Sequence, residues 1–97
     1  MAILLEWGRS VTARVFRTRR AIITLTDTTL IYEPKREPQR RVSIARADIT
    51  EVHLVTHAHW FTPTWIEVIV RHRGGVLRIP RMGRRTAERL RAALSSR

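Results

Sequence analysis

The sequence predicts a mainly β fold with one C-terminal α-helix, and three observations support this prediction. Apolar and polar residues alternate with a period of two over most of the 97 residues, which is typical of strands that bury one face. Turn-forming residues separate these segments, and strong helix formers replace them from residue 84 onward. We therefore expect a single domain over residues 1–97, with about seven antiparallel strands and a helix at about residues 84–95.

The first predicted strand covers residues 11–16. Val11, Ala13 and Val15 occupy alternate positions and are expected to form its core face. The polar stretch 17–20 that follows predicts a turn.

A hairpin is predicted next. Residues 21–26 are rich in β-branched side chains, Asp27 and its neighbour supply turn chemistry, and residues 29–32 resume an extended pattern. Pro34 and Pro38 bracket the charged stretch 35–37, and their missing backbone donors favour a loop there. A short strand at residues 41–44 follows this loop.

The middle of the chain is less regular. Residues 48–55 fit neither period well, and we interpret them as a strand that opens with a bend. Residues 56–64 contain Pro63 and predict a loop. Residues 65–71 form a clear strand, and we expect Trp65 at its start to lie in the core.

The C-terminal part combines a hairpin and a helix. Gly74 and Gly75 permit the positive φ of a tight turn, so residues 76–79 should return antiparallel to the preceding strand, and Pro80 should end it. In the helix, three apolar residues share one stripe that should dock on the core: Ala87, Leu90 and Leu94.

The charge balance is the strongest compositional observation. Nineteen basic residues against eight acidic ones give a formal net charge of +11, which favours a polyanionic partner. All the cations except Lys35 are arginines, which bind phosphate with a planar fork, although a bias toward arginine codons explains that choice equally well. The excess is concentrated after residue 70, where Glu88 is the only acid.

Several classes of function are disfavoured. The chain has no cysteine, which excludes disulfides, thiolate nucleophiles and cysteine-based metal sites. The eight acids are scattered and none lies beside a Ser or His at a suggestive spacing, so we expect no enzyme and no cofactor. The N-terminus lacks the layout of a secretory signal, and no uncharged run reaches the roughly 20 residues of a membrane span. We expect a cytoplasmic protein that can bind peripherally at the inner face of the membrane.

Two basic clusters are candidate binding sites for a partner. The first surrounds the predicted turn at residues 17–20. The second links the last hairpin to the helix and consists of Arg71, Arg73, Arg78, Arg81, Arg84 and Arg85. The candidate binding residues are Arg14, Arg17, Arg19, Arg20, Arg78, Arg81, Arg84 and Arg85. Each cluster can equally be a solvated surface that keeps the protein soluble.

The predicted loop 56–64 is a second kind of candidate site. His59, Trp60 and Phe61 are candidates for contact with a membrane or a protein, because tryptophan is favoured at membrane interfaces and in binding hot spots. The sequence leaves open whether Trp60 and Phe61 are exposed or fold back into the core. His57 and His59 are metal-ligating types, but no acid or cysteine accompanies them, so we expect no metal site.

Three segments resemble the pleckstrin-homology-like superfold, in particular its GRAM-like and bacterial members. Residues 21–32, AIITLTDTTLIY, are similar to the LT-[DN]-x-x-L-[IF]-[YF] hairpin of those domains. Residues 42–44 leading to 48–52 are similar to their I-x-L-x-D-I-x-x-V stretch, and a glycine-containing hairpin precedes a closing helix. The resemblance spans nearly the whole chain, but its short apolar motifs concern the fold more than the function.

The resemblance implies two nearly orthogonal antiparallel sheets in a sandwich or partly open barrel, closed at one end by a helix through Leu90 and Leu94. It also implies a binding module for anionic lipid headgroups, for peptides or proteins, or for copies of itself. Arg17-Thr18-Arg19 matches the [KR]-x-R element of the phosphoinositide-binding members. The turn here is much shorter than the loop that surrounds an inositol phosphate, so nonspecific attraction is expected.

The preferred hypothesis is therefore a non-catalytic binding module that docks on an anionic membrane or on a protein partner. Two alternatives stay open. The same arginines can neutralise nucleic-acid phosphates while aromatic rings stack on bases. An exposed sheet edge can also make the chain a self-associating assembly module and hence a homo-oligomer.

Overall fold

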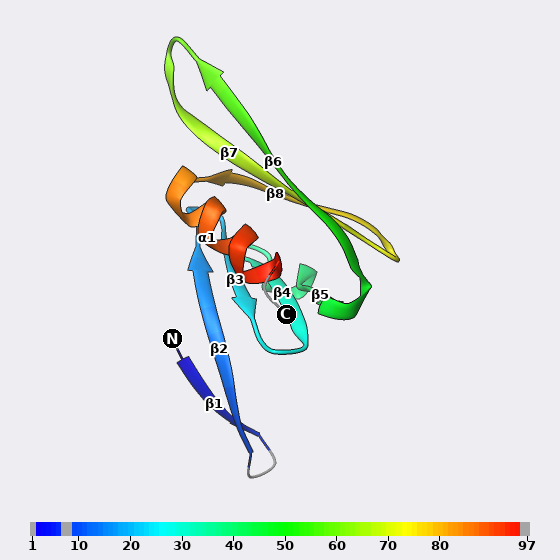
Figure 1. Cartoon of the computed structure of the whole chain (residues 1–97). Coiled ribbons are helices and arrows are strands. Elements are labelled where there is room, and N and C mark those ends of the chain that lie inside the picture. Colours follow the sequence, from blue (N-terminus) through cyan, green and yellow to red (C-terminus); the bar gives the residue numbers. More distant parts are fainter. Residues whose placement is uncertain (1, 7–8, 96–97) are drawn as a thin grey trace. The chain divides into compact units, whose positions relative to one another are not determined.

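The computed structural model describes residues 2–6 and 9–95, and the side chains from residue 13 to residue 95. It is mainly β with one C-terminal helix, as predicted, and forms two compact units, Met1–Ala47 and Asp48–Arg97 (Figure 1). Each unit contains one antiparallel sheet. Among the described residues, no helix is both long and apolar enough to cross a lipid bilayer.

The first unit is a five-stranded sheet in which each strand pairs with the next along the chain. The strands are β1 (Ala2–Glu6), β2 (Arg9–Arg17), β3 (Ala21–Leu25), β4 (Thr29–Pro34) and β5 (Val42–Ala45). Short 3₁₀ turns at Pro38–Arg40 and Arg46–Asp48 follow β4 and β5. The register places Leu30 between Leu25 and Ile44, and all three side chains are buried.

The strands of this unit include one that was not predicted and one whose face was assigned wrongly. β1 adds an eighth strand to the seven that the sequence pattern predicts. In β2, Phe16 is buried and Val15 is 40% exposed, so the predicted core face is wrong at Val15. β2 pairs with β1 up to Ala13 and with β3 from Arg14 onward, and the alternation shifts at this change of partner. The side chain of Val11 lies outside the described residues.

The second unit is a three-stranded sheet followed by the helix. Its strands are β6 (Ile49–His59), β7 (Thr62–His72) and β8 (Gly75–Met82), in that order across the sheet, and α1 spans Arg84–Ser95 as predicted. On β7, Ile66, Val68 and Val70 are buried, and α1 packs against β7 and β6. The predicted stripe of α1 is buried together with one further alanine: Ala87, Leu90, Ala93 and Leu94.

A bend and a hairpin turn of the second unit agree with the sequence pattern. The predicted bend at the start of β6 is a register shift between Ile49 and Glu51. The predicted glycine hairpin closes with His72 opposite Gly75, whose φ of +141° is a conformation that side chains other than glycine rarely adopt.

Pro80 does not end β8, which continues to Met82. β8 is an edge strand of its sheet, where a missing backbone donor is tolerated. The register also shifts here, because Ile66 pairs with Met82 whereas Val68 pairs with Ile79. Pro80 and Arg81 of β8 therefore face the single residue Glu67 of β7, which is a β-bulge.

Candidate functional site

The distal part of the β6–β7 hairpin extends beyond β8 as a two-stranded ribbon (Figure 1). β8 pairs with β7 only from Ile66 onward, whereas β6 and β7 remain paired as far as His59 and Thr62. We call residues 56–65 the ribbon. The predicted loop over residues 56–64 is therefore wrong, because both strands continue through it and only Trp60 and Phe61 form the turn.

Pro63 fits within β7 because of its position in the ribbon. At this level β7 has β6 on one side and no described partner on the other. A register shift between His57 and His59 also loosens the pairing opposite Pro63. A proline therefore costs little here, as at any edge or bulge of a sheet.

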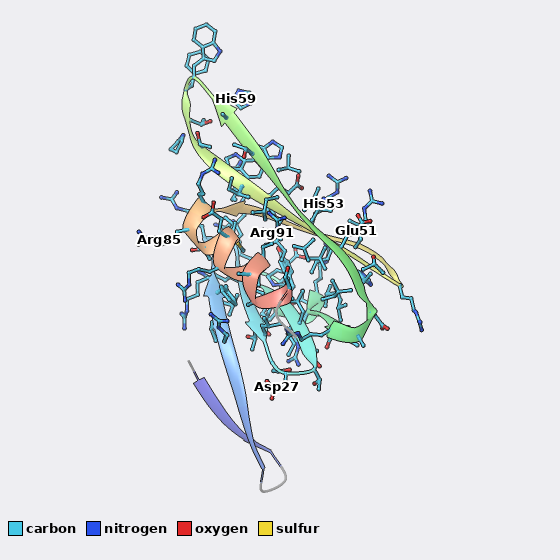
Figure 2. The ribbon with its side chains drawn as sticks, viewed as in Figure 1. Asp27, Glu51, His53, His59, Arg85 and Arg91 are labelled. Atoms are coloured by element: carbon cyan, nitrogen blue, oxygen red, sulfur yellow. The ribbon has the colours of Figure 1, made fainter. Side chains whose placement is uncertain are left out.

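The ribbon carries no fixed charge. No Asp, Glu, Lys or Arg occurs between Glu51 and Glu67, although 28% of the chain consists of these residues. The polar side chains of the ribbon itself are histidines and threonines. One of the histidines, His59, lies next to the turn (Figure 2).

The tip of the ribbon presents two exposed aromatic rings. Trp60 is 93% exposed and Phe61 is 88% exposed. Their ring centroids lie 5.9 Å apart with an angle of 4° between the planes, so the rings form an offset stack. Two large apolar side chains side by side in water are typical of a contact surface for a membrane or a partner.

Trp65, at the base of the ribbon, lies on the outer face of the sheet. It is half-buried, which corrects the prediction that it belongs to the core. Its ring stacks on His57, with centroids 4.1 Å apart and an interplanar angle of 15°. His57 Nε2 also lies 3.2 Å from Glu67 Oε1, so the acid that ends the charge-free stretch fixes the imidazole.

Arg81 reaches Trp65 from the other flank of β7. Its guanidinium carbon lies 5.5 Å from the centre of the indole ring, within range of a cation–π interaction. Arg81 is the non-glycine residue with positive φ, +58°, in the described part of the chain. It lies in the bulge of β8, and bulges commonly redirect a side chain.

Three predicted basic residues gather where β8 ends and α1 begins. We call Arg81, Arg84 and Arg85 the basic collar, and all three are exposed. Because Met82 pairs with Ile66, this end of β8 lies at the base of the ribbon (Figures 1 and 2). From the tip of the hairpin to its base, the second unit therefore presents two aromatic rings, the uncharged ribbon and the basic collar.

Arg78 is not part of the collar. It is exposed on β8, and its Nη1 lies 3.7 Å from Glu67 Oε2. Its charge is therefore partly neutralised by an acid on the neighbouring strand.

The other predicted arginines belong to the first unit, around the turn between β2 and β3. Arg14, Arg17, Arg19 and Arg20 are all exposed, and the Arg14 guanidinium lies 5.8 Å from the centre of the Phe16 ring. The turn is short, as predicted, since only residues 18–20 separate the two strands.

Burial raises the pKa of Tyr32 on β4, and the positive charge of Arg20 opposes this shift without reversing it. Arg20 is therefore close enough to the tyrosine to act on it electrostatically, while its own side chain is exposed.

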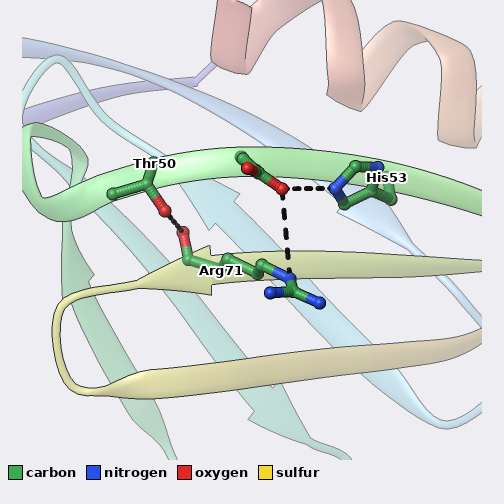
Figure 3. A network of polar contacts seen from close by, with 4 residues as sticks. Thr50, His53 and Arg71 are labelled. Atoms are coloured by element: carbon green, nitrogen blue, oxygen red, sulfur yellow. Dashed lines mark hydrogen bonds and ion pairs between the residues drawn. The ribbon is translucent and has the colours of Figure 1, made fainter.

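A polar network lies on β6 and β7 at the end of the sheet opposite the ribbon (Figure 3). Glu51 Oε2 lies 2.6 Å from His53 Nε2 and 4.0 Å from Arg71 Nε. The hydroxyl of Thr50 donates a hydrogen bond to the backbone carbonyl of Arg71 at 3.3 Å. The hydrogen bond and the charge of His53, with a smaller contribution from Arg71, lower the pKa of Glu51.

No metal-binding group is formed by the described side chains, since no three of the His, Asp and Glu residues among them converge. His53 and His57 instead contact Glu51 and Glu67, respectively.

The sequence pattern did not predict the stack of Trp65 on His57 or the strained backbone of Arg81. A signal for the ribbon was present, because His53, Val55, His57 and His59 occupy alternate positions on β6, which is the period of a strand. The left-handed conformation of Arg81 had no such signal.

No family model, no curated protein and no solved structure matches this chain.

Proposed function

We propose that this chain is a non-catalytic module that binds peripherally to an anionic membrane. The observation that carries this proposal is the exposure of Trp60 and Phe61 at the tip of an uncharged ribbon with the basic collar at its base. The tip supplies apolar contact with the membrane interface, and the collar supplies charge attraction to anionic headgroups.

The aromatic tip and the basic collar contribute similar free energies to membrane binding. Burying an aromatic side chain such as Phe61 contributes about 1.5–3 kcal/mol, and each arginine near an anionic membrane contributes about 1 kcal/mol. Stable peripheral binding generally needs two such signals, because one alone gives only marginal affinity. The second unit provides both signals, the rings between β6 and β7 and the arginines at the junction of β8 with α1.

The backbone of the ribbon limits how deeply it enters. Its two strands pair with each other, but their outer edges keep N–H and C=O groups without sheet partners among the described residues. Such groups are not tolerated in the hydrocarbon core of a bilayer. We therefore expect the rings of Trp60 and Phe61 to enter the interface while the strands stay among headgroups and water.

A pleckstrin-homology-like fold is part of this proposal. Its support is the order of the elements, in which antiparallel strands without crossovers form two sheets before a single C-terminal helix. Members of that superfold mostly bind rather than catalyse. The anionic leaflet of a cell membrane faces the cytoplasm, so this proposal places the protein at that inner face.

Vesicle sedimentation tests this function with a tip variant and a matched control. The variant W60S/F61S removes both exposed rings, and V76S removes an exposed valine at the opposite end of the sheet. We expect wild type and V76S to sediment with vesicles that contain anionic lipid but not with neutral ones. The tip variant should bind at least about tenfold more weakly, since each 1.4 kcal/mol lost is a factor of ten.

Three outcomes would overturn the proposal. Wild-type protein that binds neutral and anionic vesicles equally, or neither, has no membrane-binding site of this kind. Equal binding by wild type and W60S/F61S excludes the tip. Absence of vesicle binding together with retarded DNA or RNA in a gel-shift assay at low salt would assign the surface to nucleic acid instead.

A further inference from the structure

We propose that Arg81 is the residue that binds the phosphate of an anionic phospholipid headgroup. This inference rests on the proposed membrane binding and names the group within the basic collar that makes the specific contact. Four observations carry it: the strained backbone of Arg81, the placement of its guanidinium over the Trp65 ring, the lack of an acid partner, and its position at the base of the ribbon.

The backbone of Arg81 is held in a conformation that glycine would adopt more easily. A φ of +58° brings the Cβ atom of any other residue close to the following carbonyl oxygen. A strained non-glycine residue that persists in a fold is a candidate for function, because its side chain is then the reason for keeping it.

Trp65 orients the guanidinium. The stack on His57 holds the indole ring from the β6 side, and Arg81 approaches it from the β8 side at 5.5 Å. A guanidinium placed over an aromatic ring keeps its N–H groups in the plane of the fork, free to donate two parallel hydrogen bonds to a phosphate. This cation–π contact thus reduces the conformational freedom that the Arg81 side chain must lose when it binds.

Arg81, like Arg84 and Arg85 in the collar, has no acid partner within the described part of the chain, and in this it differs from the other arginines of the sheet that lie near an acid. Arg78 lies 3.7 Å from Glu67 and Arg71 lies 4.0 Å from Glu51. No carboxylate among the described residues lies within ion-pair distance of Arg81. Its donors are therefore available to an external oxyanion.

The position of Arg81 sets the orientation of the bound ribbon. Arg81 lies next to Met82, which pairs with Ile66 on β7. Ile66 is five residues from Phe61 along the chain, so Arg81 and the tip are about 16 Å apart along the strand direction. The headgroup layer is thinner than this, at about 5–8 Å on each side of a bilayer. Arg81 and the tip therefore reach the membrane together when the ribbon is inclined to the surface rather than upright.

The test compares R81G with R73G in the vesicle assay. Both variants replace an exposed arginine by glycine and remove one charge, but Arg73 lies in the turn at the far end of the sheet. We expect R81G to lower the affinity for anionic vesicles at least about tenfold and R73G to lower it less than about threefold. R81K, which keeps the charge but loses the fork, should fall between wild type and R81G.

Thermal unfolding separates a binding role from a structural one. Because glycine relieves the strain at a φ of +58°, R81G should have a melting temperature equal to or above that of wild type. A melting temperature that falls in parallel with affinity would show that Arg81 supports the fold, and equal affinities of R81G and R73G would also overturn the proposal.

A titration with inorganic phosphate examines the same contact without a membrane. In wild type, the NMR signals of Arg81 Nε–H and Trp65 Nε1–H should shift with phosphate, and the Trp65 shift should disappear in R81G. If wild type binds no vesicles but these shifts occur, the membrane function fails and Arg81 is a site for soluble phosphate. If vesicles bind and neither signal shifts, the inference about Arg81 fails while the membrane function stands.

Discussion

Glu51 illustrates how a single exposed side chain acquires its properties from its neighbours across the sheet. Its carboxylate contacts His53 on the same strand and approaches Arg71 on the adjacent one (Figure 3). Both neighbours favour the charged carboxylate, so the pKa of Glu51 lies below its ordinary value. The network therefore links the protonation of one residue to the pairing of β6 with β7.

The prediction at this scale concerns the pH dependence of that network. A carboxyl whose pKa is lower in the folded state stabilises the fold above its unfolded pKa, and this stabilisation is lost as the pH falls through the folded value. NMR titration of the Glu51 side-chain carboxyl should give a midpoint below that of an ordinary glutamate. H53Q should raise this midpoint, and an unchanged midpoint would show that His53 is not the cause.

Among the structural elements, the turn between β2 and β3 depends on one buried hydroxyl. Thr18 Oγ1 accepts hydrogen bonds from the backbone N–H groups of Arg20 and Ala21 at 3.2 and 3.0 Å, and donates one to the Ala21 carbonyl at 3.3 Å. Thr26 makes the same type of turn before β4. A threonine that replaces backbone partners in this way allows a three-residue connection without glycine.

T18V should therefore lower the free energy of unfolding by about 1–3 kcal/mol, because valine keeps the shape but leaves two N–H groups unpaired. T28V is the control, since the hydroxyl of Thr28 is exposed and should contribute less than about 0.5 kcal/mol. Urea unfolding measures both variants. Equal stabilities of T18V and T28V would contradict this account of the turn.

The elements also show which features a sequence can predict. The helix at residues 84–95 was confirmed at both ends, because its apolar stripe and helix-forming residues are local signals. The paired strands of the ribbon and the continuation of β8 past Pro80 were not predicted, since proline was expected to end a strand. Whether a strand has a free edge depends on its partners, and neither Pro63 nor Pro80 carries that information locally.

The candidate site was predictable only in part for a similar reason. The residue types of the tip and the collar were evident from the sequence, but the exposure of Trp60 and Phe61 follows from the length of the ribbon beyond β8. The role inferred for Arg81 depends on a bulge in β8 and on the ring of Trp65, sixteen positions earlier in the chain. Such non-local features follow from strand register rather than from residue spacing.

For the whole molecule, the excess of positive charge is shared by both units. Residues 1–47 hold ten basic and four acidic residues, and residues 48–97 hold nine basic and four acidic ones. The net charges of the units are therefore +6 and +5. Charge of one sign distributed in this way attracts anionic surfaces over the range of the Debye length, whereas the aromatic tip acts only on contact.

Salt should therefore separate the two contributions. Raising the ionic strength from about 0.1 M to about 1 M shortens the Debye length from about 10 Å to about 3 Å and should weaken binding to anionic vesicles steeply. Wild type should retain a small residual affinity at high salt through Trp60 and Phe61, and W60S/F61S should retain none. Sedimentation across a salt series measures both proteins. Binding that does not change with salt would exclude the arginines, and an identical residual affinity of the two proteins would exclude the tip.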